Sequence, residues 1–221
     1  MAVATDRKRF PGPLKVERAY EELRRMIITH ELPPGTTIDE RELMDQLEIG
    51  RTPLREAMLR LAHERLIVRS PRRGAWVSQL SLTDIQQLNE ARQLVEPPIA
   101  RLAAEHVTPA TGQQLRTMLQ RTDKQVAQGD FASLAIIDLE FHLLLGKLAA
   151  NDYLTNFSME INTSLLRYWH LSFRLADSGR VWFESHSELL ERIISGDAEA
   201  AAAEAQRHID SYRKRMRQFM G

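Results

Sequence analysis

Helix start and stop signals recur from residue 81 to the end of this chain, and they constrain its fold more than any other feature. Ser81 and Asp84 have the spacing of a capping box, and Thr108 precedes the next apolar-periodic stretch. Gly129 and Gly196 stand where helices would end. The pattern predicts about six helices, over residues 81–106, 108–129, 131–150, 153–172, 181–195 and 198–220. The short connections between them favour an antiparallel helical bundle.

The first 80 residues carry a different pattern, in which short helices are followed by a hairpin. Apolar positions at helical spacing predict a helix over 15–29. Asp39 is placed to cap a second helix, and Pro53 stands at the first helical position of a third, over 52–64. "LIVRSPRRGAWVS" then reads as two strands around a Pro-Arg-Arg-Gly turn. We therefore expect a mainly α fold, with a winged helix-turn-helix and its small β-hairpin wing in front of the helical bundle.

The third helix of the front segment has the features of a DNA-recognition helix. Arg51 and Arg55 are four residues apart and project from one face, and arginine can bind O6 and N7 of guanine with two hydrogen bonds. Two arginines at this spacing also occur on ordinary solvated faces, but the helix order and the arginine-rich hairpin favour DNA binding. The residues that we expect to contact DNA are Arg41, Arg51, Thr52, Arg55, Arg73 and Gly74.

Composition narrows the class of protein and of chemistry. The chain has no cysteine, which excludes disulfides, thiolate metal ligands and a cysteine nucleophile. Residues 1–80 carry 15 Lys+Arg against 12 Asp+Glu, and the remainder carries 15 against 18, so the asymmetry permits a nucleic-acid partner without requiring one. The polar, basic start is unlike a secretory signal, and no apolar run is long enough for a bilayer. We expect a cytoplasmic protein with no membrane partner.

The stretch "IDLEFH" puts a carboxylate and an imidazole on one helix face among apolar residues. Asp138 and His142 are four residues apart, and such a pair needs partners if it is buried. His186 lies 10 residues before Gly196 and His208 lies 12 residues after it, so the two imidazoles stand at nearly equal heights on adjacent antiparallel helices. The four side chains would suit a divalent metal, with zinc as first choice and nickel, cobalt, manganese or iron as alternatives. A simple hydrogen-bonded Asp–His pair is the competing interpretation.

The front segment resembles the DNA-binding domain of the GntR family of bacterial transcription regulators. The likeness is carried by "GTTIDERELMDQLEIGRTPLREAMLRLAHERLIVRSPRRGAWV". It implies that Arg41, Arg51, Arg55 and Gly74 meet the operator. The chain departs from the family pattern at Gly50, where a capping serine is usual, although glycine is an acceptable N-cap.

The remainder resembles the all-helical, FCD-type effector domain of the FadR subfamily. The matching words are "RQLVEPPIARLAA", "IDLEFH", "AND" and "HSELLERIISGDAEAAAAEAQRH", over about residues 84–210. In metal-binding relatives an aspartate and three histidines hold a divalent cation. The resemblance assigns that role here to Asp138, His142, His186 and His208.

The resemblance also implies a small carboxylate effector. Arg92 matches an arginine that often lines the effector cavity, although on physical grounds it could equally pair with Glu96 or lie on the surface. Asn162 and Arg167 are further candidates for effector contact.

We therefore expect a basic arm (1–13), a winged helix-turn-helix domain (14–79), and a domain for effector, metal and dimerisation (80–221). The expected function is a ligand-responsive repressor that binds a pseudo-palindromic DNA operator as a homodimer. One alternative is a regulator whose metal is purely structural and which has no effector. The other is a metal-dependent hydrolase, which we disfavour because Glu140, two residues from Asp138, points elsewhere on the helix and no other acid is placed as a general base.

Overall fold

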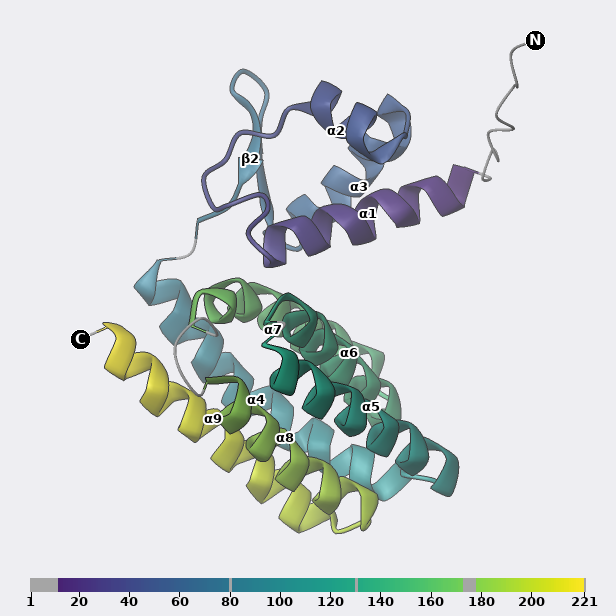
Figure 1. Ribbon diagram of the computed structural model, residues 1–221, viewed down its shortest axis with the longest axis vertical. Helices are drawn as coiled ribbons and strands as arrows, with labels where there is room; N and C mark the ends of the chain where they lie inside the picture. Colours follow the sequence, from purple (N-terminus) through teal and green to yellow (C-terminus); the bar gives the residue numbers. More distant parts are fainter. Residues whose placement is uncertain (1–11, 80, 130, 173–177, 221) are drawn as a thin grey trace. The chain divides into compact units, whose positions relative to one another are not determined.

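The structure in Figure 1 is a computed structural model, and it describes residues 12–79, 81–129, 131–172 and 178–220. Contacts between residues divide the chain into an N-terminal unit, residues 1–79, and a C-terminal unit, residues 80–221. Most of the expected basic arm, residues 1–11, lies outside the described residues. Within the described part, each helix is too short or too polar to cross a membrane.

The N-terminal unit is a winged helix-turn-helix, which confirms the fold predicted for it. Its elements are α1 (Gly12–Ile28), α2 (Glu40–Leu47), α3 (Arg51–His63), β1 (Ile67–Ser70) and β2 (Gly74–Val77). The two strands pair antiparallel, with Ile67 opposite Val77 and Ser70 opposite Gly74. Helix α1 begins three residues before the predicted start, and the other predicted elements of this unit are present.

Local signals set the turn between α2 and α3. Asp39 caps α2 by accepting hydrogen bonds from the backbone N–H groups of Arg41 and Glu42. Glu48 ends α2 in the left-handed conformation, with φ 53°. Gly50 is the extended N-cap of α3 and supplies no capping side chain. The first backbone N–H groups of α3 therefore rely on partners other than a capping side chain at Gly50.

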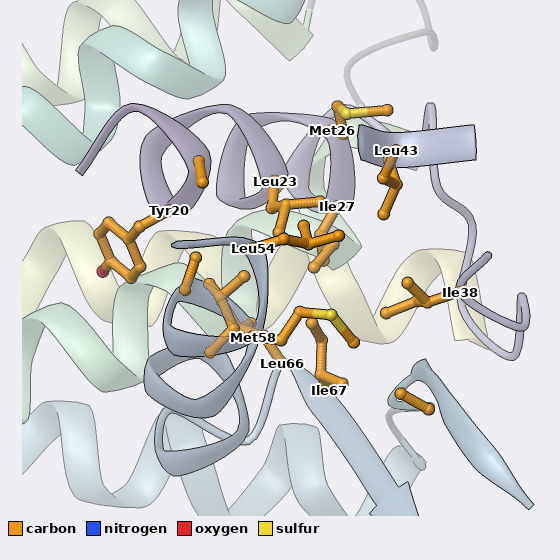
Figure 2. Close-up of a cluster of buried hydrophobic side chains, with 14 of the residues drawn as sticks. Tyr20, Leu23, Met26, Ile27, Ile38, Leu43, Leu54, Met58, Leu66 and Ile67 are labelled. Atoms are coloured by element: carbon orange, nitrogen blue, oxygen red, sulfur yellow. The ribbon is translucent and has the colours of Figure 1, made fainter. Parts of the chain in front are cut away.

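One apolar core holds α3 against the rest of the N-terminal unit. Figure 2 shows Leu23 and Ile27 of α1 facing Leu54 and Met58 of α3, and each of the four is at most 1% exposed. Full burial of side chains of this size stabilises a fold by about 1.5–3 kcal/mol each. The core therefore fixes the rotation of α3 about its axis, and with it the side on which its arginines stand.

The C-terminal unit is a helical bundle, so the mainly α class is confirmed. Its helices are α4 (Leu82–His106), α5 (Pro109–Gln128), α6 (Phe131–Ala149), α7 (Asp152–Ser172), α8 (Ser178–Ile194) and α9 (Ala198–Met220). Helix α4 contacts α6, α7, α8 and α9, and Figure 1 shows α9 running beside it. It continues as one helix through Pro97 and Pro98, which bring no N–H groups to its hydrogen-bond ladder.

The predicted helix junctions are present in the bundle. Ser81 and Thr108 each form a capping box with the residue three positions later. Between α8 and α9, Gly196 adopts φ 75°, and Asp197 accepts a hydrogen bond from the backbone N–H of Ala200 at 3.0 Å. This tight turn places α8 and α9 side by side, so residues equally distant from it meet.

Candidate functional site

The surface expected to contact DNA is exposed at every predicted position. The residues are Arg41, Arg51, Thr52, Arg55, Arg73 and Gly74. Four of them lie in the early turns of α2 and α3, and two lie where the hairpin turns into β2. At the hairpin, Gly74 has φ 78°, a conformation that favours glycine. The opposite face of α3 is buried, so the two faces of this helix are sharply different.

Arg55 forms an ion pair on this surface. Its Nε lies 2.9 Å from Oε2 of Glu40, at the start of α2. A surface pair of this kind contributes about 1 kcal/mol or less, because both groups remain in contact with water. A guanine base or a phosphate could therefore replace Glu40 as the partner of the Arg55 guanidinium at little energetic cost.

Three potential metal ligands lie together inside the C-terminal unit. Asp138 and His142 come from α6 and His186 from α8, and each offers one ligand atom within 4.8 Å of the others. Nε2 of His186 lies 3.0 Å from Oδ1 of Asp138, and Nε2 of His142 lies 3.7 Å from Oδ2. None of the three is more than 3% exposed. The fold thus gathers three of the four side chains expected to bind metal.

Glu96 of α4 forms a second polar layer behind this group. Its Oε1 accepts hydrogen bonds from Nε of Arg92 at 2.7 Å and from Nδ2 of Asn162 at 2.8 Å. The same oxygen lies 3.5 Å from Nδ1 of His142. A carboxylate near Nδ1 favours the proton on that nitrogen and leaves Nε2 with a lone pair. Nε2 of His142 is buried and makes no hydrogen bond to the described residues.

The fourth expected ligand, His208, lies beside these three residues, but its Nε2 contacts Arg92. Its ring centroid is 4.4 Å from that of His186, as the equal distances from the α8–α9 turn predict. Its Nε2, however, lies 2.9 Å from Nη2 of Arg92. Arg92 is fully buried, and its guanidinium carbon lies 5.6 Å from the centroid of the Tyr212 ring.

Burial and neighbouring charges set the protonation of these groups. Burial lowers the pKa of His142, in spite of Glu96 and Asp138, so its imidazole is neutral at neutral pH. Burial alone would raise the pKa of Asp138, but His142, a hydrogen bond from His186 and the charge of Arg92 together lower it. The pKa of Glu96 is also lowered despite burial, chiefly by its ion pair with Arg92. The result is ionised carboxylates beside a neutral imidazole, the states in which these groups bind metals.

The donor set fits a divalent transition metal. It combines one carboxylate with two buried imidazoles, and a third imidazole is adjacent. The buried Nε2 of His142, which makes no hydrogen bond within the described part of the chain, is the kind of atom that a cation would satisfy. When bound, such an ion would supply a Lewis-acidic position for an oxygen ligand.

The three residues expected to contact an effector are all buried. Arg92 and Asn162 both donate to Glu96, so they belong to the polar layer around the metal ligands. Arg167 lies further along α7, and burial lowers the pKa of its guanidinium to about 10, so it is a cation at neutral pH. The arginine–glutamate pairing considered for Arg92 is thus present, and it lies inside the bundle rather than on its surface.

Two participants in this network were missed as site residues. The sequence predicts Glu96 only as a partner for Arg92, yet this carboxylate also accepts from Asn162 and lies near His142. Tyr212 follows His208 by four residues on α9, a spacing that puts both on one face and could have identified it. The sequence carries no comparable signal for the contact between Glu96 and α7.

Comparison with protein families matches both units. Residues 15–77 match the model of the gntR family of bacterial regulatory proteins, and residues 87–211 match the FCD domain. The Escherichia coli K12 transcriptional repressor RspR is 25% identical over 203 residues, which cover 92% of this chain and 89% of the relative. The Uxu operon transcriptional regulator of the same strain is 28% identical and covers 92% and 88%.

Solved structures show the same fold. E. coli McbR/YncC superposes with a TM-score of 0.83 at 19% identity, over 94% of this chain and 99% of that one. A putative GntR regulator from Rhodococcus sp. RHA1 gives a TM-score of 0.72 at 22% identity, over 91% and 97%. With the two family matches covering most of its length, the chain belongs to the GntR family of bacterial transcription regulators, with an FCD domain as its C-terminal part.

Proposed function

We propose that this protein is a ligand-responsive repressor whose C-terminal domain binds a divalent metal and a small carboxylate effector. The observation that carries the proposal is the buried group of Asp138, His142 and His186 in a chain that also exposes an arginine-lined recognition helix. The two proposed roles follow the expected domains: residues 14–79 bind DNA, and residues 80–221 bind the metal and the effector. Because it reads chromosomal DNA, its proposed location is the cytoplasm.

In the DNA-reading role, α3 enters the major groove. Arg51 and Arg55 contact base edges, while Arg41 and Thr52 contact phosphate or base. Arg73 and Gly74 approach the backbone beside the groove. The exposure of all these positions supports the assignment.

In the sensing role, Asp138, His142, His186 and His208 hold the cation. Zinc is the first choice because it accepts nitrogen and oxygen ligands at low coordination number, and nickel, cobalt, manganese and iron also suit the set. The chain has no cysteine, so no thiolate ligand narrows the choice of metal.

Charge balance favours an anionic effector. Arg92 and Glu96 neutralise one another, so among the clustered ligands that the structure describes Asp138 is the one carboxylate that offsets the two positive charges of the ion. The buried cation of Arg167 adds a further positive charge to the interior of this domain. A small carboxylate would offset this positive charge, and Arg92, Asn162 and Arg167 are its proposed contacts.

The regulator acts as a homodimer on a pseudo-palindromic operator, because two recognition helices then read two half-sites. The effector releases DNA by binding the DNA-incompetent arrangement more tightly than the competent one. The relative RspR is named a repressor, which supports this direction of control.

Two alternatives predict different behaviour. A purely structural metal would stabilise the domain without any ligand response. A hydrolase would need a general base near the metal, but Glu140 pairs with Arg121 at 3.0 Å, and Glu96 is held by Arg92 and Asn162. These contacts favour the regulator.

The test begins by selecting the operator from random duplexes with metal-loaded protein. Small mono- and dicarboxylic acids are then titrated into the operator complex. We expect at least one acid to weaken operator binding, and we expect chelation to abolish that response. If no duplex is enriched, the DNA-reading assignment is wrong. If no acid changes affinity and chelation only lowers the melting temperature, the metal is structural.

A further inference from the structure

The ion pair between Arg55 and Glu40 occupies only one part of the guanidinium. Nε of Arg55 donates to both carboxylate oxygens of Glu40, at 3.2 Å to Oε1 and 2.9 Å to Oε2. A guanidinium has five N–H donors, and all but the one on Nε belong to its two Nη atoms. Within the described residues, these Nη atoms of Arg55 make no hydrogen bond. The edge formed by Nη1 and Nη2 is therefore open to a second ligand.

The carboxylate of Glu40 belongs to the surface that is proposed to face DNA. The Arg55 side chain is 53% exposed and that of Glu40 is 29% exposed, so a ligand can reach the pair from solvent. Glu40 is the first residue of α2, and this helix is anchored in the core of the N-terminal unit by Leu43 and Leu47. An acidic group thus lies beside one of the arginines that are proposed to contact base edges.

A neutralising carboxylate affects phosphate and base ligands differently. DNA phosphate is an anion, and its affinity for arginine comes largely from net positive charge. Glu40 cancels the charge of Arg55, so phosphate must displace the carboxylate to gain that attraction, and loss of an exposed ion pair costs up to about fivefold in affinity. O6 and N7 of guanine are neutral acceptors, and they can bind the Nη edge while the ion pair stays intact. Pairing with Glu40 therefore favours a base edge over a phosphate.

We propose that Glu40 is a specificity-determining residue, which suppresses binding of Arg55 to phosphate and reserves the Nη edge of this arginine for guanine. The inference rests on the proposed function, in which Arg55 contacts a base edge. Its consequence is that an acidic side chain within the DNA-binding surface lowers affinity for DNA of the wrong sequence. The ratio of operator binding to non-specific binding rises, and that ratio governs occupancy of an operator among many competing sites.

A double-mutant cycle on DNA binding tests the proposal. Fluorescence anisotropy gives the Kd of wild type, Glu40→Gln, Arg55→Ala and the double variant for the selected operator, its single-base variants and a scrambled duplex, over a series of salt concentrations. Arg55→Ala should lower the preference for guanine at one base pair by about 5- to 150-fold. Glu40→Gln should bind the scrambled duplex more tightly and lower the operator-to-scrambled ratio by about two- to fivefold. Its salt slope on the scrambled duplex should steepen by about 0.9, the value for one added phosphate contact. In the Arg55→Ala background, Glu40→Gln should leave the ratio and the slope unchanged.

Glu42→Gln is the matched control, because it removes the same charge from the same first turn of α2. Glu42 is exposed and lies two residues from Glu40, so it projects from another side of the helix. This variant should tighten binding to operator and scrambled duplex by the same factor. If Glu40→Gln behaves like it, Glu40 acts only by its charge and the inference is overturned. Equal weakening of both duplexes by Glu40→Gln, with a lower melting temperature, shows a merely structural role and overturns it as well.

Nitrogen-15 NMR of the arginine side chains supplies a readout on the wild-type protein. The Nε–H signal of Arg55 should be shifted from that of an arginine in an unfolded peptide, because Nε donates to Glu40, and it should stay shifted when operator is added. Its return to the unfolded-peptide position in the operator complex shows that Glu40 is displaced, which overturns the inference but leaves the base contact of Arg55 intact. If Arg55→Ala instead leaves every base preference unchanged, the base contact assigned to Arg55 in the proposed function is wrong, and the inference fails with it.

Discussion

At the scale of single residues, the interior of the C-terminal domain holds several charged side chains. Arg92, Glu96, Asp138 and Arg167 are each at most 6% exposed. Burying charges carries a large desolvation penalty, which attraction between them repays only with good geometry and further hydrogen bonds. Glu96 meets that condition by accepting from Arg92 and Asn162. Such a costly arrangement is expected where a site must bind an ion or a ligand.

Asp138 is the residue on which metal binding should depend most. Asp138→Asn keeps the shape of the side chain but removes the only carboxylate among the three clustered ligands. We expect the loss in affinity to exceed the roughly 10- to 100-fold cost of outer-shell changes. Isothermal titration with zinc measures it. Glu140→Gln is the matched control, because Glu140 lies on the same helix and pairs with Arg121. Equal affinity of wild type and Asp138→Asn would contradict the site.

Arg51 should contribute to sequence discrimination by the recognition helix. Arg51→Ala is expected to cost about 1–3 kcal/mol of operator binding and to relax preference at one base pair. Fluorescence anisotropy against the selected operator and single-base variants of it gives both quantities. Arg116→Ala removes an exposed arginine from the C-terminal unit and should leave binding nearly unchanged. A uniform loss over all sequences would reassign Arg51 to phosphate contact.

Acid should destabilise the metal-free protein. The pKa of His142 is lowered by burial, so the unfolded chain takes up this proton first as pH falls below about 6.5. The lowered pKa values of Asp138 and Glu96 add stability that is present above about pH 4 and is lost as pH falls further. Both effects lower the free energy of unfolding as the pH falls. The melting temperature, followed by circular dichroism, should fall from pH 7 to pH 4; a flat or rising profile would contradict these shifts.

At the scale of elements, α6 and α7 approach closely through one glycine. A Cβ added at Gly146 would lie 2.7 Å from Cγ2 and 2.8 Å from Oγ1 of Thr155. The Thr155 hydroxyl is held by a 2.8 Å hydrogen bond to the carbonyl of Asn151, so it cannot easily turn away. The contact fixes the spacing of the helices that carry Asp138, His142 and Asn162.

Gly146→Ala should therefore destabilise the bundle. Overpacking costs typically about 1–3 kcal/mol, which exceeds the gain of about 1 kcal/mol from replacing glycine within a helix. In a Thr155→Ala background the obstacle is gone, and the same substitution should stabilise. Urea unfolding of the four proteins in this cycle measures both effects. A stabilising Gly146→Ala in the wild-type background would show that the helices separate freely.

At the scale of the whole molecule, the proposed regulator must couple a buried site to a DNA-binding surface. A ligand shifts a two-state equilibrium only by its difference in affinity for the two states, and a full reversal from 1:99 to 99:1 needs about 10⁴-fold. The buried polar network joins α4, α6, α7 and α9, so a ligand that rearranges it would act on four helices at once.

Dimeric binding gives a prediction at this scale. Sedimentation analysis should find two chains on one operator, with half-site centres about 34–36 Å apart or a multiple of that spacing. Scrambling one half-site should weaken binding far more than scrambling the spacer between them. A complex with one chain per duplex and full affinity for a single half-site would refute the homodimer.

Much of this architecture is local in origin and therefore predictable from the sequence. The caps at Ser81 and Thr108 and the turn at Gly196 act within one helical turn, and each lies where predicted. The juxtaposition of His186 and His208 also follows from the chain, because a tight turn between two helices pairs residues equally distant from it.

The partnerships within the site were decided only by the tertiary structure. Glu40 pairs with Arg55, Glu96 meets Asn162, and Arg92 engages His208. The sequence by itself determined where helices begin and end and which of their faces are apolar or charged, because those signals act over a few residues. Which polar groups meet depends on the rotation and crossing of packed helices, and that is set by the summed close packing of the whole core.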